Sequence, residues 1–319
     1  MPDAKTLAPV ALFVYNRPDH TLTTLNALTK NDLASQTHLY VFSDGPRPGR
    51  NEEAVISEVR EIVCQGLWCG KVTVVTQEHN LGLATSIRQG IDSLLKDHDR
   101  VIVLEDDIAT APGFLRYMND ALILYADDDR VMNVSGYIPS TSYQWMLPET
   151  FFLRHMSCWG WATWRRAWQQ AIWDASRALQ SISAMPSGIH RFDLEGRYEY
   201  SRQLRQNLDG SLSTWAIFWL SSIYIAGGFS LFPRQSLVSN TGFDGTGEHC
   251  SPNDHGGHNV HLAENIAVVP VAVRESLRGR FYLKSFFQYG RDASVTHRLW
   301  RVAGRAKHKL ASVIRRWVA

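Results

Sequence analysis

The first 126 residues alternate short apolar runs with longer amphipathic stretches, and this alternation constrains the fold more than any other feature. The apolar runs, each rich in β-branched residues, lie at 10–15, 39–43, 72–76 and 101–104. The helix-like stretches lie at 20–29, 52–63, 83–95 and 113–126. Short runs of this kind predict parallel strands buried on both faces. The alternation predicts an α/β fold with a doubly wound, mostly parallel sheet and right-handed crossovers.

Polar side chains follow all four expected strands. In strand order they are Arg17, then Asp44, then His79 and Asn80, then Glu105, Asp106 and Asp107. Ligands in doubly wound sheets bind at the carboxyl ends of the strands. Each residue alone also has a structural interpretation, with Asp44 as a turn residue and Asn80 or Asp107 as a helix cap. Four polar strand ends on one rim indicate a ligand site instead.

The acidic triplet Glu105-Asp106-Asp107 stands directly after the apolar run at 101–104. Neighbouring carboxylates raise each other's pKa and repel, so the arrangement costs free energy unless a cation lies beside it. A divalent metal would supply that cation. The triplet taken alone fits a helix cap nearly as well as a metal site.

The second half of the chain is rich in tryptophan, above all at 158–173, and has a second apolar stretch at 213–240. We expect most of these aromatic residues to form the core of a mixed layer beside the sheet, with some free to stack on a sugar. The segment 242–257 is rich in Gly, Asp and His. It is typical of a mobile loop that closes over a substrate, with Glu248 and His249 as contacts, and equally of an ordinary connector.

The rim residues, the HNLGLA stretch before the acidic triplet and the WGWATW stretch after it resemble the GT-A nucleotide-sugar glycosyltransferases. The chain is similar to N-acetylglucosaminyltransferase I and to bacterial family-2-like transferases of surface-polysaccharide pathways, over residues 10–250. The resemblance implies a Rossmann-like GT-A fold. It also implies a nucleotide-sugar-binding half at 1–137, an acceptor and catalytic half at 138–275, and a basic C-terminal tail at 276–319.

Carried over by position, the resemblance assigns the first three strand ends to the nucleoside of a UDP-sugar donor. It implies that Asp44 accepts a hydrogen bond from the uracil ring and that Arg17 lies beside the nucleotide. It places His79 against the base, with Asn80 next to it.

The resemblance divides the acidic triplet among three roles. It implies that Asp106 meets the ribose, that Asp107 binds Mn²⁺ or Mg²⁺, and that Glu105 lies behind them or beside the donor sugar. A divalent cation held by one or two carboxylates and by donor phosphates would neutralise the leaving diphosphate. Such a site should bind metal poorly without the nucleotide.

The activity implied is inverting, metal-dependent sugar transfer to a glycan or polyprenyl-linked hydroxyl, which requires a general base. Relatives of this kind are expected to carry an acidic residue just before the helix that contains Trp215. This chain has Ser213 and Thr214 there. Neither hydroxyl can act as the base at neutral pH, although Ser213 could cap the helix.

Asp209 is the nearest acid upstream, and Asp244 and Glu195 are more distant alternatives for the base. The base could also be missing. That possibility keeps a second hypothesis open, a non-catalytic relative that binds nucleotide sugars or glycans. A sugar-nucleotide nucleotidyltransferase is a third, although Asn16-Arg17-Pro18 stands where that class needs a Gly-rich phosphate loop.

Charge and composition bound the partners and the location. A formal net charge of +2 gives no reason to expect nucleic-acid binding. Residues 296–319 hold seven Lys or Arg and no Asp or Glu, which fits a basic amphipathic helix on an anionic membrane and equally a terminal helix packed on the domain. The sequence lacks a signal-peptide pattern and a membrane span, so we expect a cytoplasmic protein, either free or peripheral on the inner face of the plasma membrane. Four scattered cysteines predict reduced thiols without a zinc site.

Overall fold

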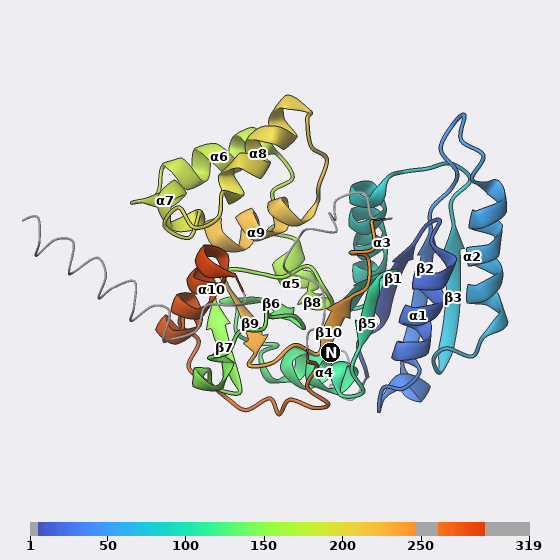
Figure 1. Cartoon of the computed structure of the whole chain (residues 1–319), viewed down its shortest axis with the longest axis horizontal. Helices are drawn as coiled ribbons and strands as arrows, with labels where there is room; N and C mark the ends of the chain where they lie inside the picture. The colour runs from blue at the N-terminus through green and yellow to red at the C-terminus, as the bar shows by residue number, and fades with distance from the viewer. Residues whose placement is uncertain (1–5, 246–260, 291–319) are drawn as a thin grey trace, which may run out of the picture.

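The computed structural model describes residues 6–245 and 261–290 (Figure 1). Its main sheet has eight strands in the order β3-β2-β1-β4-β8-β6-β9-β7. These strands are β1 Val10–Val14, β2 His38–Ser43, β3 Lys71–Thr76, β4 Arg100–Glu105, β6 Val131–Ser135, β7 Thr150–Leu153, β8 Trp161–Trp164 and β9 Phe229–Pro233. The first four are parallel, whereas β8 runs antiparallel to both β4 and β6, and β7 runs antiparallel to β9.

Helices flank this sheet. They are α1 Pro18–Leu28, α2 Glu53–Gln65, α3 Leu83–Asp97, α4 Phe114–Leu124, α5 Arg165–Trp168, α6 Ala175–Ser183, α7 Gly188–Phe192, α8 Tyr200–Asp209, α9 Ala216–Ile225 and α10 Leu277–Tyr289. The predicted α/β class and mostly parallel sheet are confirmed, as are the four strand–helix pairs. The expectation that all four strands are buried on both faces was wrong for β3, which is half-exposed because it forms the edge of the sheet.

Alternate side chains of β1 build the two cores of the molecule. Ala11 and Phe13 face a core that contains α3 and the aromatic second half. The alternating residues Val10, Leu12 and Val14 face a core filled by α1, α2 and α4. Figure 1 shows α6, α7 and α8 grouped as a helical layer over α9, apart from α1 and α2. The burial of both faces follows from the near-continuous apolar run of β1.

The strand order reverses between β1 and β4, which are paired neighbours. From β1 the chain builds outward through β2 and β3, and then returns to place β4 on the other side of β1. This reversal is a topological switch point, where the strand ends leave a crevice. A small second sheet lies beside it, because β5 Ile108–Thr110 pairs with β10 Val238–Asn240. That pairing brings residues 240–242 next to the acidic triplet.

The tryptophan-rich second half is core, as expected. Trp161 stacks on Trp215 with ring centroids 5.2 Å apart, and Trp168 and Trp219 complete a buried aromatic cluster. Strands from both expected halves join the one sheet, and the domain division at residue 137 stays a prediction. Of the tail expected at 276–319, Leu277–Tyr289 form α10, and the strongly basic part at 296–319 lies outside the described residues. In the described part of the chain, no helix is long and apolar enough to span a membrane.

Candidate active site

A cavity of about 450 Å³ opens at the switch point, at the carboxyl ends of β1, β2 and β4. Its other walls come from the first turn of α3, from Cys158 and Trp159, and from the start of α9. Ligand pockets typically enclose several hundred Å³, so the cavity has room for a substrate or cofactor of moderate size. The structure therefore brings residues from all four predicted strand ends to one hollow, since Asn80 after β3 also lines it.

Arg17 bridges two members of the acidic triplet. Its Nη2 donates to Asp106 Oδ1 at 2.9 Å and lies 2.7 Å from Asp107 Oδ2. All three side chains are only 13–14% exposed. Burial lowers the pKa of Arg17, but the two carboxylates, with Asp244 at longer range, outweigh burial and raise it. The cation that the triplet requires is therefore a guanidinium in this structure.

Burial is the largest influence on the pKa values of Asp106 and Glu105. Removal from water raises the pKa of Asp106 to about 7, with Arg17 lowering it and Asp107 raising it. Burial also raises the pKa of Glu105 well above its usual value, and the charges of Asp107 and Asp106 add to the rise. Ionising all three acids beside one guanidinium therefore costs free energy, which is typical of a site built for a cationic or cation-bearing ligand.

The backbone around Asp107 is fixed by the small second sheet. Thr241 donates to the Asp107 carbonyl both from its backbone N–H at 2.8 Å and from its hydroxyl at 3.1 Å. Gly242 lies so close that an added Cβ would be 2.3 Å from Asp107 Oδ2. Its backbone N–H donates to Asn240 Oδ1 at 2.7 Å. Only glycine leaves this carboxylate in place.

Asp44 is buried at the end of β2 and accepts four hydrogen bonds. Its Oδ1 accepts from the N–H of Gly45 at 2.9 Å and of Leu81 at 2.8 Å. Its Oδ2 accepts from the N–H of Gly82 at 3.0 Å and from Asn80 Nδ2 at 3.1 Å. A carboxylate has about four acceptor positions, so Asp44 already holds the loop after β3 in place. Its contact with a uracil ring stays a prediction.

The two residues predicted after β3 differ in position. Asn80 lines the cavity and bonds both Asp44 and the Gly45 carbonyl. His79 is exposed and is not among the residues that line the cavity. Its role against the nucleobase stays a prediction.

The wall opposite the strand ends is formed by Gln203, Ser213, Thr214 and Trp215. Ser213 is not a helix cap as expected, since α9 begins at Ala216 and Trp215 occupies the cap position without a side-chain bond. Asp209 is exposed at the end of α8, where its Oδ1 accepts from the N–H of Ser211 at 2.9 Å, and it does not line the cavity.

Asp244 lies nearer to the acidic triplet than Asp209 does. Its Oδ2 is 3.2 Å from Nε2 of His20, which in turn lies 3.3 Å from the Thr241 carbonyl oxygen. Glu195 pairs with Arg280 and Lys284 on α10, outside the cavity lining. Glu248 and His249 lie outside the described residues. The base assignment stays a prediction for both Asp209 and Asp244.

Several cavity residues were missed by sequence reasoning. Tyr15 donates to Glu52, which also accepts from Asn16 Nδ2 at 3.3 Å and from the N–H of Arg47 at 3.2 Å. Burial and the Glu52 bond raise the pKa of Tyr15 to about 12. The signal that could have identified this group is the first strand end itself, since Tyr15 and Asn16 directly precede Arg17.

Three buried polar atoms at the cavity have no hydrogen-bond partner in the described structure. They are Arg17 Nε, Ser86 Oγ and Thr214 Oγ1. Ser86 also lines a second cavity of about 180 Å³ on the other side of Asp44. Buried polar groups are normally satisfied, so unpartnered ones around a hollow indicate positions where a ligand bonds.

The acidic edge provides hard oxygen ligands suited to Mg²⁺ or Mn²⁺. Within residues 6–245 and 261–290, no group of three or more His, Cys, Asp or Glu is placed to hold a metal. Asp106 and Asp107 each direct one oxygen at the same Arg17 nitrogen, so two carboxylates already converge on one cationic point. The donor set fits a divalent ion that takes its other ligands from substrate and water.

No family model matches the chain, and no curated protein does. Among solved structures, the crystal structure of TarS from S. aureus, a glycosyltransferase, matches 41% of this chain and 22% of its own length, at 17% identity and a TM-score of 0.27. The matched region is thus a small part of that larger protein, and a TM-score of this size leaves the reaction to be inferred from the site.

Proposed function

We propose that this chain is a GT-A glycosyltransferase that takes a sugar from a nucleoside-diphosphate donor, preferably a UDP-sugar. The observation that carries the proposal is the meeting of Arg17 with Asp106 and Asp107 in a cavity at the β1–β4 switch point. Doubly wound sheets bind nucleotides at this point. An acidic pair that needs a cation beside a guanidinium that suits phosphate favours a diphosphate ligand with a metal.

In this proposal Asp107, helped by Asp106, would hold Mn²⁺ or Mg²⁺. When bound, the metal would neutralise the diphosphate that leaves the sugar. Arg17 would turn its unpartnered Nε toward the same phosphates, and Asn80 would lie beside the nucleoside. Thr214 and Trp215, on the opposite wall, would meet the acceptor, which we take to be a glycan or a polyprenyl-linked glycan of a surface polysaccharide.

An inverting transfer needs a base that removes the proton of the acceptor hydroxyl. We favour Asp244 over Asp209 for this role. Asp244 acts electrostatically on Arg17 and pairs with His20, whereas Asp209 lies at the end of α8 and accepts a hydrogen bond within its own turn. The proton taken from the acceptor hydroxyl would be held on Asp244, whose Oδ2 lies 3.2 Å from His20 Nε2.

A non-catalytic nucleotide-sugar-binding protein is the second candidate. It is favoured by the acceptor wall, which is formed by Gln203, Ser213, Thr214 and Trp215 and to which the described residues contribute no carboxylate. A turnover assay with UDP-sugars and a pool of lipid-linked acceptors separates the two candidates. Donor binding without transfer of sugar supports the second.

The experiment that tests the proposal is calorimetric titration of UDP with and without Mn²⁺, on the wild type and on Asp107→Ala. We expect Mn²⁺ to strengthen UDP binding to the wild type and to have no effect on Asp107→Ala. Asp129→Ala is the matched control, since Asp129 is 88% exposed and is not among the residues that line the cavity. UDP binding that does not respond to Mn²⁺ in the wild type would overturn the metal assignment.

A further inference from the structure

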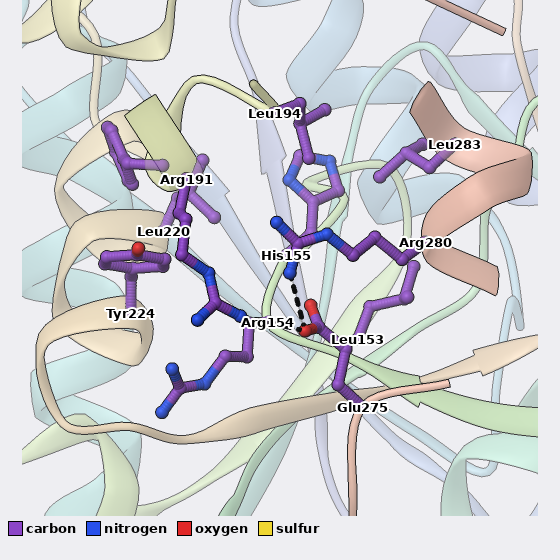
Figure 2. Close-up of a pocket in the computed structure, with 11 residues that line it drawn as sticks. Leu153, Arg154, His155, Arg191, Leu194, Leu220, Tyr224, Glu275, Arg280 and Leu283 are labelled. Carbon is purple, nitrogen blue, oxygen red and sulfur yellow. Dashed lines mark hydrogen bonds and ion pairs between the residues drawn. The ribbon is translucent and has the colours of Figure 1, made fainter. Parts of the chain in front are cut away.

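A third and much smaller cavity, of about 20 Å³, lies among the end of β7, α7, α9 and α10 (Figure 2). Its lining includes three arginines, Arg154, Arg191 and Arg280, together with Glu275 and Tyr224. None of these five lines the cavity at the acidic triplet. The enclosed part has room for about one water molecule, so a larger ligand would bind at its mouth.

Arg280 forms close ion pairs with two carboxylates beside this cavity. It bonds Glu275 Oε2 at 2.9 Å and also pairs with Glu195, which in turn pairs with Lys284. Arg191 reaches the same Glu275 oxygen only at 3.6 Å, beyond hydrogen-bond length, and is 45% exposed. Four cationic side chains therefore face two carboxylates, with Arg191 poorly paired.

Arg154 has no carboxylate within ion-pair distance in the described part of the chain. Its guanidinium lies instead beside the rings of Tyr224, at 5.9 Å, and Phe229, at 5.8 Å. Gly227 leaves space for it, since an added Cβ there would be 3.0 Å from Arg154 Nη2. The aromatic contacts and the tight fit hold Arg154 in place, and they leave its charge without a counter-ion.

The charges of this cluster converge on one point. Burial raises the pKa of Tyr224, while Arg191, Arg154 and Arg280 each lower it and Glu275 raises it. All three guanidiniums are thus close enough to act on the same phenol group. Figure 2 shows Arg154 and Arg191 extending toward the side of the cavity on which Tyr224 lies.

We propose that Arg154 and Arg191, supported by Arg280, bind a phosphate group. Planar guanidinium forks pair with phosphate oxygens through two parallel bonds, and a phosphate ester brings between one and two negative charges. Those negative charges would balance the positive charge of the arginines that Glu275 does not neutralise. The two arginines come from the end of β7 and from α7, so a phosphate would also join these elements.

The position of this site relative to the large cavity indicates which molecule carries the phosphate. Ala216, at the start of α9, lines the large cavity, and Tyr224, near its end, lines the small one. Eight residues of helix separate them, which is about 12 Å. Resting on the proposed glycosyltransfer, the site would hold a phosphate of the acceptor while the acceptor sugar reaches the donor. The donor diphosphate has its own place beside Arg17.

The test is a calorimetric titration of inorganic phosphate into full-length protein saturated with UDP, in low-salt buffer free of metal. We expect saturable binding to the wild type, about tenfold weaker binding to Arg191→Gln, and none to the double variant Arg154→Gln/Arg191→Gln. Arg116→Gln removes the same charge from the exposed pair with Asp32 and should bind phosphate as the wild type does. Arg191→Gln, at an exposed position, keeps the test valid if the double variant does not fold.

Equal phosphate binding by the wild type and Arg191→Gln overturns the proposal, as does the absence of saturable binding to the wild type. Vesicles of phosphatidylglycerol form the second arm. If the double variant loses vesicle binding and keeps phosphate binding, the cluster is a lipid contact and the proposal fails. The UDP titration that precedes these steps tests the donor site separately, so a failure there counts against the proposed function alone.

Discussion

Asp106→Asn should raise the free energy of unfolding of the ligand-free protein and weaken binding of the metal and the donor. The pKa of Asp106 is about 7, against about 3.9 for an unfolded Asp. Because the folded pKa is raised, the contribution of this group to stability is complete below pH 4 and is lost as the pH rises through 7. At pH 8 the ionised carboxylate costs roughly 4 kcal/mol relative to a neutral side chain, and at pH 5 roughly 1.5 kcal/mol. Asparagine is neutral at both.

The assay is thermal unfolding at pH 5 and pH 8, with EDTA and without nucleotide. For 319 residues, roughly 4 kcal/mol corresponds to a rise in Tm of about 6 °C, and the gain should shrink to about 2 °C at pH 5. Asp129→Asn is the control, expected to change stability by less than about 0.5 kcal/mol at either pH. A lower Tm for Asp106→Asn at pH 8, or a gain independent of pH, would refute the reasoning.

Three further predictions concern the same rim. Gly242→Ala places a Cβ 2.3 Å from Asp107 Oδ2 and should raise the Mn²⁺ concentration needed for half-maximal UDP binding, with little change in metal-free UDP affinity. Asp44→Asn loses acceptors for two of its four donors and should destabilise the fold by about 3 kcal/mol in urea unfolding; a loss below about 1 kcal/mol would contradict the role given to Asp44. Asp244→Asn should lower kcat at least about a hundredfold with donor KM kept, whereas Asp209→Asn should leave kcat unchanged; the reverse result assigns the base to Asp209.

The strands and the rim were predictable because their signals are local. Each apolar run ended where a polar residue began, and parallel strands necessarily bring such ends to one edge. Sequence position also identified the triplet as the place that needs a cation. It could not identify the cation, because Arg17 reaches Asp106 and Asp107 only through the pairing of β1 with β4, 89 residues apart in sequence for the Arg17–Asp106 bond.

Side-chain direction and distant pairing account for what the sequence did not reveal. His79 and Asn80 are neighbours in one loop, yet Asn80 lines the cavity and His79 is exposed, because the loop is held by its bonds to Asp44. Gly242 lies against Asp107 only because β10 pairs with β5. No periodicity in the sequence encodes either fact.

The charges at the rim also order the binding events. With Arg17 seated between Asp106 and Asp107, a metal entering alone would have to displace a guanidinium that is already 2.7 Å and 2.9 Å from their oxygens. A diphosphate entering alone would meet three nearby carboxyl groups and one arginine. If both entered together, Asp106 and Asp107 would be available to hold the metal and Arg17 would be available to bond the phosphates, so every charged group would have a partner. The proposed site should therefore bind Mn²⁺ weakly by itself, and donor and metal should each strengthen the binding of the other by the same factor.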